Sequence, residues 1–92
     1  MKDLAQCRAE IDVVDRQIIK LFEERMEICK DVVRYKMAND LQIFDASREQ
    51  AILDALAQKT TPEMLPYTQE LWRTLMTLSK QLQQVVVDTE GK

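Results

Sequence analysis

The chain has 92 residues, of which 46% are hydrophobic and 32% are charged, and its formal net charge is -3. This length corresponds to a single domain with enough apolar material for a core. A negative net charge argues against a surface for nucleic acid or anionic membranes, since such surfaces need an excess of Lys and Arg. There is one Gly and there are two Pro, while good helix formers dominate. The composition therefore predicts one all-α domain over residues 1–92.

Neither a membrane segment nor a metal site is expected. No stretch approaches the roughly 18 apolar residues of a membrane span, and the N-terminus has no apolar signal core, so we expect a cytoplasmic protein. The chain has no His, and its cysteines, Cys7 and Cys29, lie about 33 Å apart along one predicted helix. They cannot pair within one chain, and two lone thiols do not form a zinc site. We expect both to be buried thiols.

The first predicted helix runs from about Asp3 to Met37 and ends where Asn39 and Asp40 favour a turn. Residues at alternating steps of three and four share one face of this helix. We call this face the seam; it consists of Leu4, Cys7, Ile11, Val14, Ile18, Leu21, Arg25, Ile28, Val32 and Tyr35. Arg25 interrupts the seam with a permanent positive charge, and burial of an unpaired guanidinium is costly. The seam therefore predicts an anionic partner for Arg25, which a ligand can supply.

The length of this helix predicts a dimer. A helix of this length measures roughly 50 Å, whereas a compact domain of this size has a radius of gyration of about 12 Å. One chain can hardly cover such a helix, and a long heptad seam is a normal way for helices to associate side by side. We therefore expect an obligate homodimer.

The second predicted helix begins with Asp45 as its N-cap and continues to about Lys59. Asp45, Arg48 and Glu49 occupy the first turn of a face that is apolar further along the helix. Simple capping explains this pattern if the two carboxylates are favoured by the helix dipole and Arg48 is solvated. The alternative is that the three side chains belong to a binding site.

The third predicted helix follows a connection at residues 60–62 and runs from about Pro66 to Val86. Ser79 and Gln83 lie at i and i+4 within its apolar stripe. A buried hydroxyl and a buried amide lower stability unless they find hydrogen-bond partners. The remaining residues, 87–92, are expected to be frayed or to be the stub of a longer protein.

The polar residues that face the predicted core are Arg8, Arg25, Lys36, Asp45, Arg48, Glu49, Ser79 and Gln83. Arg25 and Lys36 are three helical turns apart on one face, roughly 16 Å at the backbone, so their long side chains can converge on one small molecule. Arg8 lies about 25 Å from Arg25 along the same helix and cannot join them. An antiparallel partner helix would bring a second Arg8 to the same place.

In these eight residues the sequence resembles the all-α chorismate mutases. The pattern comprises Arg8 in Cys-Arg-Ala-Glu-Ile-Asp, Arg25 in Glu-Glu-Arg-Met, Lys36 in Arg-Tyr-Lys, Asp-Ala-Ser-Arg-Glu at residues 45–49, and finally Ser79 and Gln83. Each piece is weak alone, but eight polar positions in order and at compatible spacing are specific. The resemblance implies a three-helix protomer with a long N-terminal helix. It also implies an intertwined homodimer in which each active site borrows one Arg from the neighbouring chain.

The activity implied by the resemblance is the rearrangement of chorismate to prephenate, the branch step toward phenylalanine and tyrosine. This pericyclic reaction breaks a C–O bond and forms a C–C bond within one molecule, and it requires no metal or cofactor. Chorismate has two carboxylates, which Arg25 and Arg8 of the partner subunit are suited to hold. Negative charge grows on the ether oxygen as the C–O bond breaks, and donors from Lys36 and Gln83 favour that transition state.

The resemblance implies further roles for the start of the second helix and for the third helix. Glu49 and the backbone near Asp45 are expected to bind the ring hydroxyl of the substrate, and Ser79 is expected to touch a carboxylate. Arg48 is expected to help position the start of the second helix. Glu49 thus joins Arg25, Lys36 and Gln83 among the residues expected to be catalytic.

Two alternatives stay open at this point. An isochorismate-pyruvate lyase of the same fold uses a related substrate and a similar pericyclic route, although the polar residues at the start of the second helix favour the mutase. A non-enzymatic helical dimerisation module would pair Arg25 with Glu10 or Glu24 of another chain, but it does not explain Ser79 and Gln83. The sequence does not tell whether the domain stands alone or is fused to a prephenate dehydratase or dehydrogenase, or whether aromatic amino acids regulate it.

Overall fold

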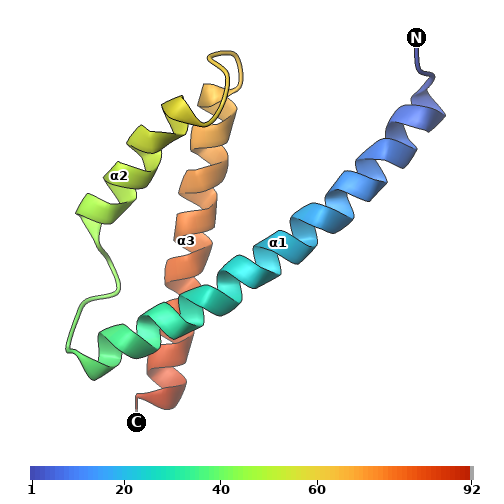
Figure 1. Cartoon of the computed structure of the whole chain (residues 1–92). Helices are drawn as coiled ribbons and strands as arrows, with labels where there is room; N and C mark the ends of the chain where they lie inside the picture. The colour runs from blue at the N-terminus through green and yellow to red at the C-terminus, as the bar shows by residue number, and fades with distance from the viewer. Residues whose placement is uncertain (92) are drawn as a thin grey trace.

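A computed structural model describes residues 1–91 and contains three α-helices and one short 3-10 helix (Figure 1). The helices are α1 (Leu4–Ala38), α2 (Ala46–Ala55) and α3 (Leu65–Glu90), and the 3-10 helix η1 (Leu56–Gln58) directly follows α2. The predicted all-α fold with a long N-terminal helix is confirmed. No helix within the described residues is both long and apolar enough to cross a membrane.

Local signals explain where α1 begins and ends. Asp3 and Gln6 form a capping box, in which the backbone N–H of Gln6 donates to Asp3 Oδ1 over 2.8 Å and that of Asp3 donates to Gln6 Oε1 over 3.0 Å. At the other end Asp40 adopts a φ of 54°, a left-handed conformation that Asp tolerates better than most residues. The chain therefore turns at residues 39–40, as the sequence predicts.

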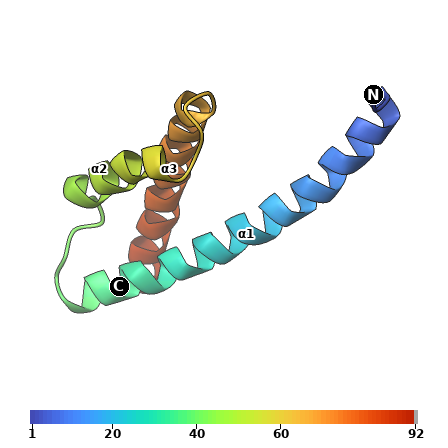
Figure 2. The ribbon, with the colours of Figure 1, turned by 45° about the horizontal axis from the view of Figure 1, so that its top comes forward.

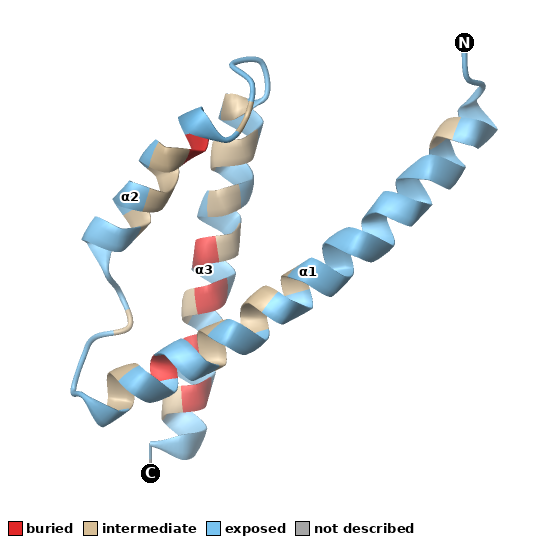
Figure 3. Cartoon of the chain, in the orientation of Figure 1, coloured by how far each residue is buried: buried red, intermediate tan, exposed pale blue. Residues whose placement is uncertain are grey.

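The N-terminal half of α1 extends away from the rest of the molecule (Figures 1 and 2). The radius of gyration is 16.7 Å and the longest extent is 56 Å, well beyond a compact domain of this length. Apart from Cys7, the apolar residues of the seam are 41% to 66% exposed, and the N-terminal half of α1 is almost entirely pale blue, the colour of exposed residues, in Figure 3. Within one chain the seam thus lacks a cover.

The core lies where the C-terminal half of α1 packs on α3 and where η1 packs on α3. Its buried apolar side chains are Val33, Leu56, Met76 and Val86. Val33 is 0% exposed although it lies beside the seam and not on it. In the C-terminal half of α1, the side that carries Val33 thus packs against α3, whereas the seam residues Ile28 and Tyr35 are exposed and Arg25 and Val32 face a pocket. The sequence pattern predicts the seam but not the packed side.

The ends of α2 and α3 differ from the predicted ends. The second helix is α-helical only to Ala55, and its last turn, predicted as part of one helix to about residue 59, is the 3-10 helix η1. Helix α3 continues to Glu90, four residues beyond the predicted end. Arg34 of α1 lies 3.2 Å from Glu90, and the hydrogen bond and charge of Glu90 raise the pKa of Arg34. Residues 87–90 are thus helical, with an ion pair to α1 at Glu90, where a frayed segment was one expectation. Lys92 lies outside the described residues.

Candidate functional site

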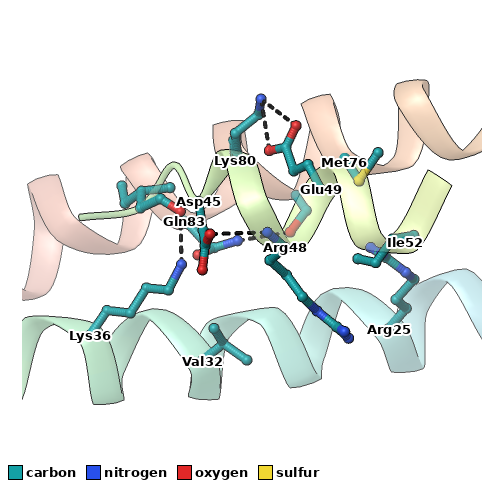
Figure 4. Close-up of a pocket in the computed structure, with 12 residues that line it drawn as sticks. Arg25, Val32, Lys36, Asp45, Arg48, Glu49, Ile52, Met76, Lys80 and Gln83 are labelled. Atoms are coloured by element: carbon teal, nitrogen blue, oxygen red, sulfur yellow. Dashed lines mark hydrogen bonds and ion pairs between the residues drawn. The ribbon is translucent and has the colours of Figure 1, made fainter. Parts of the chain in front are cut away.

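A pocket lies between the C-terminal half of α1, the start of α2 and the middle of α3 (Figure 4). Seven of the eight candidate residues line it, namely Arg25, Lys36, Asp45, Arg48, Glu49, Ser79 and Gln83. They come from three helices that are far apart in the sequence. The fold therefore brings together polar side chains whose proximity the sequence alone does not show.

Helix α1 contributes Arg25 and Lys36 from one face, as their separation of three turns requires. Lys36 Nζ donates to the backbone carbonyl of Ile43 over 2.8 Å, and Ile43 lies in the loop before α2 (Figure 4). An ammonium group has three N–H bonds, so two of them stay free for a ligand. The bond to the loop thus holds the Lys36 charge at the pocket.

The start of α2 combines capping with placement at the pocket. The backbone N–H of Arg48 donates to Asp45 Oδ1 over 3.0 Å, and that of Glu49 donates to the Asp45 carbonyl over 3.0 Å. Asp45 therefore caps α2, as the simpler interpretation of the sequence proposed. Capping does not remove these side chains from the pocket, because the Arg48 side chain points from α2 toward α1 (Figure 4).

Lys80 also lines the pocket, although the sequence analysis did not identify it. Its Nζ lies 3.0 Å from Glu49 Oε2 and 4.7 Å from the centre of the Phe44 ring. Lys80 is the residue after Ser79 and lies three before Gln83, so its place next to two core-facing polar residues was an available signal. A single Lys beside an apolar stripe is normally solvated, however, and only the packing of α2 on α3 brings Glu49 to it.

Ser79 and Gln83 lie in the interior, each 6% exposed. Gln83 Nε2 donates to Ser79 Oγ over 2.8 Å, and Ser79 Oγ donates to Cys29 Sγ of α1 over 2.9 Å. Gln83 Oε1 is buried and accepts no hydrogen bond from any of residues 1–91. The predicted need of these two groups for partners is thus met except at one oxygen atom.

Arg8 does not lie at the pocket of its own chain. It is exposed, in the extended half of α1, and that helix is continuous from Leu4 to Ala38. Seventeen residues of straight helix separate Arg8 from Arg25 by about 25 Å. The structure therefore places seven candidates together and leaves the eighth apart, as the length argument requires.

The charged residues that line the pocket are Arg25, Lys36, Arg48 and Lys80, together with Asp45 and Glu49. Four cations and two carboxylates give the pocket a formal charge of +2, although the whole chain carries -3. The Glu49 carboxylate is paired with Lys80, so the side toward α1 holds most of the unpaired positive charge. This arrangement suits a small ligand with two negative charges.

The sequence of the chain matches the family model of chorismate mutase type II over residues 7–84. The chain belongs to this family. The match includes all eight candidate residues, and it confirms the resemblance drawn from them.

Two curated relatives are similar to part of the chain. A T-protein from Haemophilus influenzae is 40% identical over 55 residues, which are 60% of this chain and 15% of that protein. A chorismate mutase from Methanocaldococcus jannaschii is 38% identical over 56 residues, which are 61% of this chain and 57% of that protein. The matched part thus spans less than two thirds of the length of either relative.

Proposed function

We propose that this protein is a chorismate mutase, which rearranges chorismate to prephenate in the biosynthesis of phenylalanine and tyrosine. The observation that carries the proposal is the pocket of this member of the chorismate mutase type II family. Arg25, Lys36 and Gln83 line this pocket, and the charged residues around it have a formal charge of +2. Chorismate is a small dianion, so its charge complements that of the pocket. Because the reaction is intramolecular and pericyclic, the protein has to bind, orient and donate hydrogen bonds, and no step calls for a cofactor.

Binding of the two carboxylates supplies orientation. Arg25 is suited to hold one carboxylate, and Arg8 of the partner subunit is suited to hold the other, because guanidinium groups bind carboxylates through paired charge-assisted hydrogen bonds. Ser79 lines the same pocket and is assigned to a carboxylate of the ligand. Fixing both carboxylates favours the compact conformer in which the carbon atoms that form the new bond are close.

Donation to the ether oxygen lowers the barrier. As the C–O bond breaks, this oxygen gains negative charge, so a donor placed there binds the transition state more tightly than the ground state. Lys36 has two N–H bonds that its contact with Ile43 does not use. Gln83 supplies a neutral amide on the opposite helix. We assign the electrostatic part of catalysis to these two side chains.

The start of α2 is assigned to the ring hydroxyl. Glu49 is an acceptor for that hydroxyl, and the ion pair with Lys80 keeps its carboxylate at the edge of the pocket. Asp45 fixes the first turn of α2 through its capping bond, and the backbone beside it offers further hydrogen-bonding groups. Arg48 positions this turn against α1. These groups hold the ring while the bond to the ether oxygen breaks.

A homodimer completes the site in this proposal. The exposed apolar residues of the seam give a second copy of α1 an apolar surface that is interrupted at Arg25. An antiparallel arrangement of two such helices carries Arg8 of the partner subunit to the pocket that lacks it. A cytoplasmic location stays a prediction.

The test is a pair of assays on one preparation. We expect the protein to convert chorismate to prephenate and to have the mass of a dimer in solution. Isochorismate is the second substrate, because turnover of isochorismate without turnover of chorismate would assign the protein to the lyase. Inactivity on both substrates by a folded dimer would contradict the enzymatic proposal and favour the dimerisation module.

A further inference from the structure

Three polar groups from two helices form a row at the pocket, in which Ser79 and Gln83 are buried and Cys29 is half-buried. Cys29 Sγ of α1 lies 2.9 Å from Ser79 Oγ, and Ser79 Oγ lies 2.8 Å from Gln83 Nε2. Arg25 Nη1 lies 4.0 Å from the same sulfur atom. Cys29 does not line the pocket itself, but it touches two residues that do. The row thus connects a thiol to the amide assigned to the ether oxygen.

The present direction of these bonds leaves one buried group without a partner. A hydroxyl has a single hydrogen, and that of Ser79 is donated to Cys29, so Ser79 can only accept from Gln83. Gln83 Oε1 then has no donor among residues 1–91 although it is buried. An unpaired buried carbonyl is unfavourable. An acceptor is also the wrong group to present to the electron-rich ether oxygen of a substrate.

The opposite direction gives Gln83 Oε1 a donor. If the Cys29 S–H donates to Ser79 Oγ, the Ser79 hydroxyl is free to donate to Gln83 Oε1. The amide then turns by 180° within the same space, so that its NH2 group takes the place of the buried Oε1 and is left for a ligand. The Cys29 sulfur keeps its lone pairs toward the Arg25 guanidinium.

We propose that Cys29 is a positioning residue whose thiol donates to Ser79 and thereby turns the Gln83 amide so that its N–H faces the substrate. This inference rests on the proposed function, because it concerns the donor for the ether oxygen. Cys29 does not touch the substrate. It selects which end of the Gln83 amide does so.

The first arm of the test observes the thiol directly and does not depend on activity. The Cys7→Val variant retains a single S–H group, that of Cys29, whose infrared stretching band moves to lower frequency when the thiol donates a hydrogen bond. We expect this band to move to higher frequency when Ser79→Ala is added, because the acceptor is lost. An unchanged band would show that Cys29 does not donate to Ser79, and it would overturn the proposal.

The second arm measures catalysis in three Cys29 variants. Cys29→Val is similar in size but has no donor, Cys29→Ser retains one, and Cys29→Ala is the second donor-free variant if valine prevents folding. We expect loss of the donor to lower kcat about fivefold, the effect of one neutral hydrogen bond, with KM changed less than about twofold. Cys29→Ser should restore most of kcat. Cys7→Val is the matched control, since it removes the other thiol of the same helix.

A double-mutant cycle separates positioning from a merely structural effect. If Cys29 acts through Ser79, adding Cys29→Val to Ser79→Ala should change kcat by less than about twofold. An additive loss, or a Cys29→Val protein with the parent kcat, would overturn the proposal. Absence of chorismate turnover in the parent protein would instead refute the proposed function, and the infrared band would still decide whether Cys29 donates to Ser79.

Discussion

The borrowed Arg8 gives the most direct test of the proposed site. Helix α1 is continuous from Leu4 to Ala38, so no bend can return Arg8 to the pocket of its own chain. The separation of about 25 Å from Arg25 follows from 17 residues at 1.5 Å each. Arg8→Ala and Arg25→Ala should each be nearly inactive as homodimers, because every site then lacks one carboxylate-binding guanidinium.

Mixing the two variants should restore part of the activity. In a mixed dimer, the site built on the Arg8→Ala chain has its own Arg25 and receives an intact Arg8, whereas the other site lacks both. Random exchange makes about half of the dimers mixed, and each of these has one complete site of two. Recovery should therefore approach about a quarter of the parent activity if the two sites act independently.

The assay unfolds and refolds the two variants together and follows the loss of chorismate. Each variant refolded alone is one control. Arg16→Ala is the matched control, since Arg16 is exposed on the same half of α1 and does not line the pocket; its homodimer should stay active. If mass measurements demonstrate subunit exchange but activity stays at the level of the separate variants, the shared site must be abandoned.

Three further predictions concern single residues. Gln83→Glu should be active in acid and lose activity as pH rises past neutrality, because a carboxyl group donates to the ether oxygen only while protonated; a pH profile of kcat measures this. Lys36→Ala should lower kcat by about 100-fold in a dimer that stays folded, as measured by turnover and circular dichroism. Val33→Ala should lower the free energy of unfolding by about 2 kcal/mol in denaturant titrations at fixed protein concentration, since Val33 is 0% exposed.

Each of these predictions has an outcome that contradicts it. A pH profile of Gln83→Glu equal to that of the parent would remove Gln83 from the ether oxygen. Loss of helicity with near-normal kcat would make Lys36 a structural residue. For Val33→Ala the comparison is Val85→Ala, an exposed position on α3, and equal effects of the two substitutions would argue against the core described here.

The helices and the candidate residues depend mostly on local sequence. Helix propensity, the Asp45 cap and the turn at residues 39–40 act over a few residues, so the pattern of side chains along the chain predicts them. The spacing of Arg25 and Lys36 places them on one face of any regular helix. The pattern of core-facing polar positions, in which the family resemblance lies, comprises eight residues, and the structure places seven of them around one pocket.

The tertiary structure decided how these elements meet. Only the packing of α1 on α3 shows that Val33 is buried while the apolar residues of the seam beside it stay largely exposed. The periodicity of a helix shows which residues share a face, but it does not show which helix packs against that face. The Glu49–Lys80 pair likewise joins residues that are 31 positions apart in the sequence. The contact of Cys29 with Ser79 joins residues that are 50 positions apart. Such contacts depend on the angle and register at which helices cross, which many side chains set together and no single segment encodes.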